Sequence, residues 1–151
     1  MEKGINCRIE DKGQIKEILE LFTPCLESLR SGRTDITIMS EKLWRHGNVL
    51  IYQVEGKMIG FAAFYSNDFI NHTAFLSLIA VLEEWRGKGI AKDILEEVIN
   101  ISRKKGMKRL RLEVNKANVH AIRFYTNRGM VVIEENETSF FMESCIYAKD
   151  R

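Results

Sequence analysis

The sequence predicts an α/β protein in which helices and strands alternate around one mixed sheet. Segments whose apolar residues recur at helical spacing alternate with short β-rich runs, in the order α, α, β, β, β, α, β, α, β, β. A buried apolar strand followed by a helix and a further strand also predicts a right-handed β-α-β crossover. We therefore expect a parallel strand pair within the sheet.

Length and composition predict one domain spanning residues 1–151. The chain is 45% hydrophobic and 29% charged, with a single proline and no low-complexity run that would serve as a linker. A chain of this length buries about 70% of the surface that its unfolded form exposes, so it needs no disulfide or structural metal. A formal net charge of +2 is too small to indicate a dedicated nucleic-acid-binding protein.

The first third of the chain predicts two helices. Asp11 is a candidate N-cap, and we expect a helix from about Lys12 to before Pro24. The apolar stripe of this helix consists of Ile15, Ile18, Leu19 and Phe22. Ser40, followed by residues 41–44, predicts a short helix with Ser40 as its cap.

Three β-rich runs come next. Val49 to Val54 and Met58 to Tyr65 are separated by Glu55-Gly56-Lys57, which predicts a hairpin. Phe75 to Leu82 is apolar almost throughout, as expected of a central strand covered on both faces.

The second half of the chain predicts two helices and three strands. In order, they are a helix from Ile90 to near Gly106, a strand over 109–115, a helix over 117–128, and strands at 130–133 and 139–147 around a polar hairpin tip at 134–138. Within the first of these strands, Arg109, Arg111 and Glu113 alternate with apolar residues and so share one face.

Cysteine usage and hydropathy predict a cytoplasmic protein. The three cysteines, Cys7, Cys25 and Cys145, are widely spaced and odd in number, which fits free thiols in a reducing compartment. No basic segment followed by an apolar run opens the chain, and no stretch approaches about 18 apolar residues, so we expect neither secretion nor a membrane span. The three histidines lack metal-ligand spacing, and we expect no metal site.

The clearest chemical signal is the run Arg86-Gly87-Lys88-Gly89-Ile90-Ala91, where the buried strand passes into a helix. A helix start carries unpaired backbone N–H groups and a partial positive charge, and glycines let a phosphate approach those donors. The simpler interpretation, a tight turn shaped by two glycines, is less favoured at a helix start. Residues 86–128 hold twelve basic and four acidic residues, a local charge of +8. Such a block suits a multiply charged anion or a set of solvated helix faces, and both interpretations stay open.

Two other nucleotide-binding patterns fit less well. No G-x-x-x-x-G-K-[ST] occurs, which excludes a Walker loop. A Rossmann fingerprint would need glycine or alanine at position 92, where the chain has Lys92, although Glu113 stands near the position of its acidic residue.

At this turn the sequence resembles the GNAT superfamily of acetyl-coenzyme A-dependent N-acetyltransferases, whose pyrophosphate loop reads Gln/Arg-x-x-Gly-x-Gly/Ala. Arg86, Gly89 and Ala91 match its fixed positions, and Ile79-Ala80-Val81 is similar to the family's splayed central strand. A second family motif is matched at 112–118 together with Ala121, Phe124-Tyr125, Arg128 and Gly129-Met130. The resemblance covers residues 48–148 and includes the first 47 residues by helix placement only.

The resemblance implies a mixed, mostly antiparallel sheet of six to seven strands with a splayed central parallel pair, flanked by about four helices. It implies transfer of an acetyl group from acetyl-coenzyme A, a cosubstrate, to a primary amine by direct attack in a ternary complex. The amine belongs to a small molecule or a protein, and a homodimer is left open. The cofactor-binding residues that it implies are Ile79, Val81, Arg86, Gly87, Lys88, Gly89, Ile90, Ala91, Asn118 and Tyr125.

The resemblance also implies catalytic residues. Tyr125, a phenol with an ordinary pKa of about 10, would protonate a leaving thiolate whose parent thiol lies near ~8.5. The amide of Val81 would polarise the thioester carbonyl. Some relatives carry a glutamate base where this chain has Phe75, so Glu113 is the candidate base, with His72 in reserve.

Several alternatives remain beside these expectations. Glu113 could instead form ion pairs with the arginines on its strand face, and Asn118 could serve only as a helix cap. Trp44, Phe69 and Trp85 are expected in the core rather than in an acceptor pocket. The cysteines lie outside the matching motifs, which disfavours a ping-pong route. The rival functions are a non-catalytic coenzyme A-binding regulatory module and a basic nucleic-acid-binding domain, and neither has a motif of its own.

Overall fold

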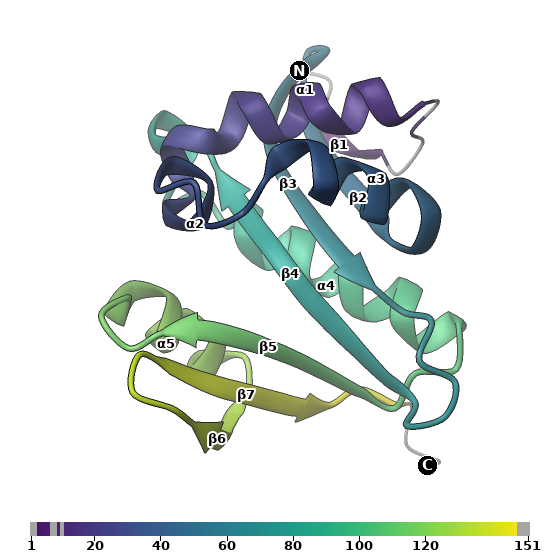
Figure 1. Ribbon diagram of the computed structural model, residues 1–151, viewed down its shortest axis with the longest axis vertical. Coiled ribbons are helices and arrows are strands. Elements are labelled where there is room, and N and C mark those ends of the chain that lie inside the picture. Colours follow the sequence, from purple (N-terminus) through teal and green to yellow (C-terminus); the bar gives the residue numbers. More distant parts are fainter. Residues whose placement is uncertain (1–2, 7–8, 10, 148–151) are drawn as a thin grey trace.

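The computed structural model describes residues 3–6, 9 and 11–147, and Figure 1 shows the arrangement of its elements. The strands are β1 (Lys3–Asn6), β2 (Asn48–Val54), β3 (Lys57–Tyr65), β4 (Thr73–Val81), β5 (Arg109–Asn115), β6 (Val131–Glu135) and β7 (Ser139–Cys145). The α-helices are α1 (Lys12–Phe22), α2 (Glu27–Arg30), α3 (Ile36–His46), α4 (Ile90–Lys104) and α5 (Val119–Asn127). Two short 3₁₀ helices are η1 (Thr23–Cys25) and η2 (Glu83–Trp85). Every predicted helix and strand is present, and the structure adds β1 and α2.

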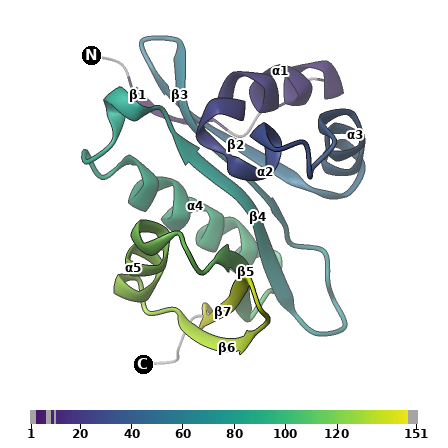
Figure 2. The same cartoon turned by 60° about the vertical axis from the view of Figure 1, so that its left-hand side comes forward.

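The strands form one seven-stranded sheet in the order β1-β2-β3-β4-β5-β7-β6, covered by helices on both faces. Figure 2 shows α1, α2 and α3 on one face and α4 and α5 on the other. Each helix layer has its own apolar core: Phe22 of α1 packs against Phe61 of β3 with ring centroids 4.7 Å apart, and Ile94 of α4 is fully buried on the opposite face. The mixed sheet flanked by helices confirms the predicted fold class.

Strands β4 and β5 form the expected parallel pair, but they pair over only part of their length. The parallel register runs from Thr73–Arg109 to Leu76–Leu112, whereas β4 continues to Val81 and β5 to Asn115. Beyond Leu76 and Leu112 the two strands separate, and their ribbons diverge in Figure 1. The other strand pairs of the sheet are antiparallel. The central pair is therefore splayed, as the family resemblance implied.

The N-terminal helices differ in one respect from the sequence prediction. The Asp11 carboxylate accepts a hydrogen bond from the Gln14 amide at 3.0 Å, which confirms the cap of α1. The prediction that Ser40 caps the second helix was wrong, because α3 begins at Ile36 and Asp35 caps it. Ser40 lies inside the helix, where its hydroxyl donates to the Ile36 carbonyl. The β-branched run after Asp35 has weak intrinsic helix propensity, which hid this helix start in the sequence.

The two hairpins form where the sequence placed them. Glu55 and Gly56 both have positive φ values, of 50° and 78°, as a two-residue turn of type I′ requires between β2 and β3. The C-terminal tip is shorter than predicted: β6 extends to Glu135, so that only residues 136–138 connect it to β7. No helix in the described part of the chain is long and apolar enough to cross a membrane.

Two aromatic residues that we expected in the core are on the surface. Trp44 is 44% exposed and Phe69 is 63% exposed. Phe69 lies in the loop before β4, and Trp44 lies near the end of α3. Trp85 is half-buried and packs against the edge of the core on the α4 side.

Candidate active site

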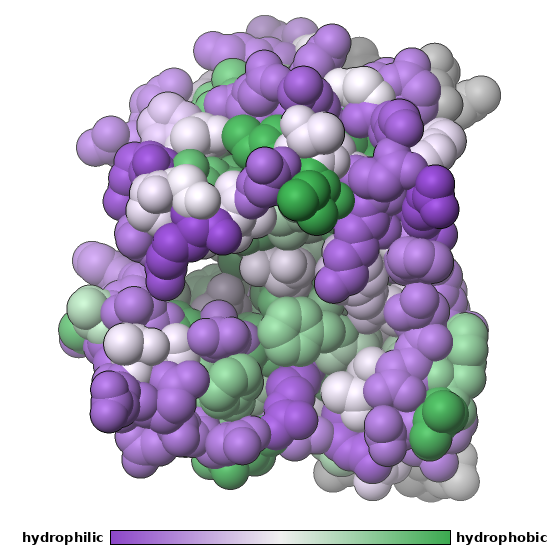
Figure 3. All heavy atoms as spheres, in the orientation of Figure 1, coloured by the Kyte–Doolittle hydropathy of each residue, from purple (hydrophilic) through white to green (hydrophobic). Residues whose placement is uncertain are grey.

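A cleft of about 1290 Å³ opens where β4 and β5 separate. Its floor is formed by residues of β4 and β5, one end by the turn that leads into α4 together with α5, and the opposite wall by residues 25–28 with Arg33 and Thr34. Figure 3 shows the surface hollowed between the part that carries α1–α3 and the part that carries β5–β7. The cleft brings together ten of the eleven residues that the sequence assigned to the site: Ile79, Val81, Arg86, Gly87, Gly89, Ile90, Ala91, Glu113, Asn118 and Tyr125.

The backbone of β4 faces the cleft at Ile79 and Val81. The Leu82 amide donates to the Ile59 carbonyl of β3 at 2.9 Å, and the backbone groups of successive strand residues point to alternate sides. Those of Val81 and Ile79 therefore point away from β3, toward the space that β5 has left. The Arg86 side chain donates to the Val81 carbonyl at 3.0 Å, which agrees with this direction. Two residues of β4 thus offer backbone groups to an extended ligand.

The turn before α4 presents a set of backbone donors. Gly87 and Gly89 adopt φ values of +77° and +80°, and no atom lies within 4 Å of where a Cβ would stand at either position. The first amide of α4 that finds a partner is that of Asp93, which donates to the Gly89 carbonyl. In the described chain, no group accepts a hydrogen bond from the amides of residues 87–92. Unpaired donors of this kind, together with the positive end of the helix dipole, are suited to an anionic ligand.

Basic side chains surround that surface, although Lys88 does not line the cleft. Arg86 and Lys92 line it, together with Arg128 at the end of α5. The Lys88 ammonium instead lies 5.9 Å from the centre of the Trp85 ring. The basic block of the sequence is therefore divided, because Arg109, Arg111 and Lys116 form ion pairs with Glu143, Glu134 and Glu135 outside the cleft.

Tyr125 is buried on α5 and lines the cleft. Its ring contacts that of Phe124 edge to face, with centroids 5.4 Å apart. Desolvation by burial raises the pKa of Tyr125 far above its ordinary value, so the phenol keeps its proton. The phenol makes no hydrogen bond to any residue that the structure describes. A neutral O–H donor without a protein partner is thus available to a ligand.

Glu113 is exposed on β5 and lines the cleft. The arginines on its strand face pair with other carboxylates: Arg109 lies 3.4 Å from Glu143, and Arg111 lies 3.2 Å from Glu134. Glu113 forms no ion pair with a described residue. The alternative role in which Glu113 pairs with these arginines was therefore wrong.

Asn118 and His72 have different surroundings. The Asn118 side chain caps α5, accepting from the Ala121 amide at 3.2 Å, and its residue also lines the cleft. Only its oxygen is used by the cap, which leaves the NH₂ group for a ligand. His72 precedes β4 at the end remote from Val81, where its carbonyl accepts from the Lys108 amide, and it does not line the cleft. The structure therefore does not bring the reserve base to the site.

Several cleft residues were not assigned to the site from the sequence. His120 of α5 was not singled out as a ligand-binding residue, whereas Phe124 and Arg128, the residue that follows α5, were named only as matches to a family motif. The three follow one another at intervals of four and so lie on one helix face. That spacing was a usable signal. The wall residues from Cys25 to Thr34 carried no local signal, because they reach the cleft only through the packing of α1 and α3 on the sheet. Phe75 and Trp85 also line the cleft. In the described chain no cluster of three or more potential metal ligands is present.

Comparison with known proteins identifies relatives for most of the chain. A spermine/spermidine N(1)-acetyltransferase of Bacillus subtilis is 32% identical over 81 residues, which are 50% of this chain and 53% of that protein. A 5-NmdU N-acetyltransferase of Pseudomonas phage PaMx11 is 30% identical over 121 residues, or 80% of this chain and 83% of that protein. The match to the Bacillus protein thus spans about half its length.

Solved structures show the same fold. The PaiA N-acetyltransferase of Thermoplasma acidophilum, determined in complex with coenzyme A, superposes with a TM-score of 0.75 at 23% identity, covering 96% of this chain and 99% of that one. The sequence model of the acetyltransferase (GNAT) family matches residues 15–130. That match includes the turn before α4, both splayed strands and α5. The chain therefore belongs to the acetyltransferase (GNAT) family.

Proposed function

We propose that this protein transfers an acetyl group from acetyl-coenzyme A to a primary amine by direct attack in a ternary complex. One observation carries the proposal: the splay of β4 and β5 opens beside a helix start whose amides, from Gly87 to Lys92, have no acceptor within the described chain. An extended thioester with a pyrophosphate matches both features. Membership of the GNAT family supports the same cosubstrate.

In the proposed complex the pyrophosphate accepts hydrogen bonds from the amides of the turn, with Arg86 and Lys92 compensating its charge. The pantetheine arm lies along β4 and pairs with the outward backbone groups of Ile79, because the Val81 carbonyl already accepts a hydrogen bond from Arg86. The Asn118 NH₂ group donates to a carbonyl of the same arm. These contacts bring the thioester carbonyl to the Val81 amide, which stabilises the negative charge that develops on the carbonyl oxygen.

The chemistry needs one proton removed and one proton supplied. An amine with an ordinary pKa of about 10.4 is mostly protonated at neutral pH, so Glu113 accepts its proton before the nitrogen attacks. The new C–N bond forms as the C–S bond breaks, and the electron pair leaves on sulfur. Tyr125, which burial keeps protonated, then donates its proton to the thiolate to release coenzyme A.

The first test is a calorimetric titration of the protein and its Gly89→Glu variant with acetyl-coenzyme A. A carboxylate at position 89 places negative charge where the pyrophosphate binds, so we expect tight binding in the wild type and at least about a tenfold loss in the variant. Gly89→Asn is the matched control, because asparagine tolerates the positive φ of +80° and adds no charge. An unchanged affinity in Gly89→Glu would place the phosphates elsewhere.

Binding without turnover is a separate outcome. An acceptor screen that follows free thiol release would then show no amine-dependent signal, although acetyl-coenzyme A binds. That result would favour a non-catalytic coenzyme A-binding module over a transferase. Failure of the wild type to bind acetyl-coenzyme A at all would refute the whole proposal.

A further inference from the structure

The charges around the cleft carry an inference about the acceptor, which rests on the proposed function. We propose that the acceptor brings only one positive charge into the cleft, that of the reacting amine. The Glu27–Arg33 ion pair on the cleft wall acts as the specificity element that disfavours polyamines. This assignment follows from which carboxylates are free to bind a second ammonium group.

Only two of the described residues that line the cleft carry a carboxylate, Glu27 and Glu113. Four lining residues are permanently cationic: Arg33, Arg86, Lys92 and Arg128. Arg86 and Lys92 lie at the turn into α4 and Arg128 at the end of α5, which is the side proposed for the phosphates. The acceptor side therefore holds Glu27, Arg33 and Glu113, with a net formal charge of −1.

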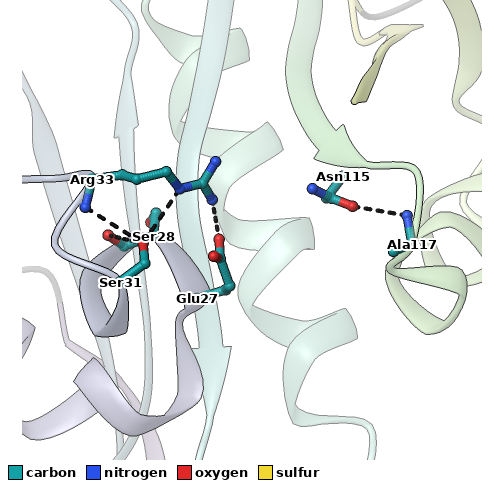
Figure 4. A network of polar contacts seen from close by, with 6 residues as sticks. All are labelled: Glu27, Ser28, Ser31, Arg33, Asn115 and Ala117. Atoms are coloured by element: carbon teal, nitrogen blue, oxygen red, sulfur yellow. Dashed lines mark hydrogen bonds and ion pairs between the residues drawn. The ribbon is translucent and has the colours of Figure 1, made fainter. Parts of the chain in front are cut away.

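Glu27 is already neutralised within its own segment. Its carboxylate forms an ion pair with the Arg33 guanidinium across the turn that follows α2. The Ser31 hydroxyl accepts from both the Arg33 amide, at 3.4 Å, and the Arg33 Nε atom, at 3.3 Å. Figure 4 shows this network on the wall of the cleft, with Asn115 of β5 on the opposite side. An approaching ammonium meets a pair of zero net charge here.

Carboxylates on the nearby strands are also paired. Glu143 pairs with Arg109, Glu134 with Arg111, and Glu135 with Lys116 at 2.6 Å. Glu113 is thus the unpaired carboxylate of the acceptor side, and the proposed mechanism uses it to accept the proton of the reacting amine. A second ammonium group on the acceptor would find no free carboxylate and would approach the Arg33 cation.

The substrate class that fits is a primary amine with uncharged surroundings, such as a peptide N-terminus or an aminated neutral sugar or nucleoside. The hydroxyl groups of Ser28, Thr34 and Ser139 line the same cleft and offer hydrogen bonds to neutral polar groups of such an acceptor. Specificity here comes both from repulsion of a second ammonium group by Arg33 and from hydrogen bonds to neutral groups of the acceptor.

The test compares hexylamine with hexane-1,6-diamine, which have the same carbon chain and differ by one ammonium group. We measure kcat/KM for both through thiol release, in the wild type and in Arg33→Gln. The wild type should use hexylamine at least as well as the diamine, after correction for the second equivalent amine. Arg33→Gln frees Glu27 and removes a cation, so the diamine/hexylamine ratio should rise by up to about fivefold, the upper range for an exposed ion pair.

Two further variants separate charge from loop structure. In the double variant Glu27→Gln/Arg33→Gln both charges are absent, so the ratio should return toward the wild-type value. A ratio that stays at the Arg33→Gln value would attribute the effect to a disturbed loop and overturn the assignment. Arg45→Gln is the matched control, because Arg45 forms an exposed ion pair with Glu41 on α3, outside the cleft, and should leave the ratio unchanged.

The remaining outcomes are also decisive. A wild type that prefers the diamine beyond the statistical correction would overturn the inference while leaving the transferase proposal intact. If no amine releases thiol and acetyl-coenzyme A does not bind, the proposed function itself has failed. The two failures are therefore distinguished by the calorimetric titration on the same protein.

Discussion

Tyr125 shows how burial fixes the protonation state of a single side chain. The Tyr125 side chain extends from α5 and packs in the core. Burial raises its pKa because the phenolate would be poorly solvated there. The hydroxyl nevertheless belongs to a residue that lines the cleft and has no protein acceptor among the described residues. The phenol is therefore protonated at neutral pH and unshared with the protein, and in the proposed mechanism it is the group that donates to the thiolate.

The variant Tyr125→Phe tests this role directly. It removes the proton donor and keeps the ring, so kcat should fall by about 10²-fold or more, the usual contribution of a general acid. The affinity for acetyl-coenzyme A, measured by calorimetry, should be nearly unchanged. A variant with the wild-type kcat would remove Tyr125 from the mechanism.

The variant Glu113→Gln tests the base. The amide cannot accept a proton from the amine, so kcat should fall by about 10²-fold and the acidic limb of the pH–rate profile should flatten. Glu137→Gln, in the turn between β6 and β7, is the control and should keep the wild-type profile. If Glu113→Gln retains the wild-type acidic limb at equal height, a water relay becomes the preferred route for the proton.

At the scale of elements, α5 lines the cleft, and its N-terminus is capped by Asn118, a residue that we also propose to bind the cosubstrate. The Asn118 side chain caps the helix through its oxygen, while Tyr125 and Arg128 lie at the other end of α5. The same side chain is therefore expected to contribute to stability and to binding. The two contributions are separable because they use different atoms of the amide.

The pair Asn118→Ala and Asn118→Asp makes this separation. Asn118→Ala should lower the free energy of unfolding by about 1 kcal/mol, the usual effect of losing an N-cap, as measured by urea denaturation. Asn118→Asp keeps an oxygen acceptor, so its stability should stay close to that of the wild type, but it lacks the NH₂ donor and should bind acetyl-coenzyme A more weakly. Wild-type affinity in Asn118→Asp would assign the residue to capping alone.

At the scale of the whole molecule, the cleft lies where two parts of one continuous sheet separate. Its wall belongs to the layer of α1–α3, and its opposite end to α4 and α5, while β4 and β5 pair over four residues only. A ligand bound between the separated ends of β4 and β5 contacts both parts, and these contacts exist in the folded state but not in the unfolded state. Binding should therefore stabilise the entire fold.

Thermal unfolding measures this stabilisation. Acetyl-coenzyme A at about 100 times its Kd should add about 2.7 kcal/mol to the free energy of unfolding. For a chain of this size the corresponding rise in Tm is roughly 5–10 °C. Gly89→Glu at the same ligand concentration should show little or no rise. An equal rise in the variant would indicate binding away from the turn before α4.

Local patterns accounted for most of the elements. The stripe of α4 and the alternation in β5 lie within one element each, so neighbouring residues were sufficient to predict them. The strand β1 was missed, because it is short and Lys3–Asn6 pairs with β2 residues about 50 positions away. The helix α2 has only four residues and no side-chain cap, and therefore little periodicity to detect.

The sequence by itself indicated the glycine turn before α4 and the order of the elements other than β1 and α2, because these depend on glycine conformation, helix capping and apolar spacing among residues close together in the chain. Tyr125 and Glu113 became candidates through the resemblance to a family motif. Only the tertiary structure decided where the splay begins, that Glu113 is unpaired, and that Glu27 and Arg33 form the opposite wall of the cleft. These features depend on side-chain pairing and on the packing of separate helix layers, which bring together residues that no local pattern relates.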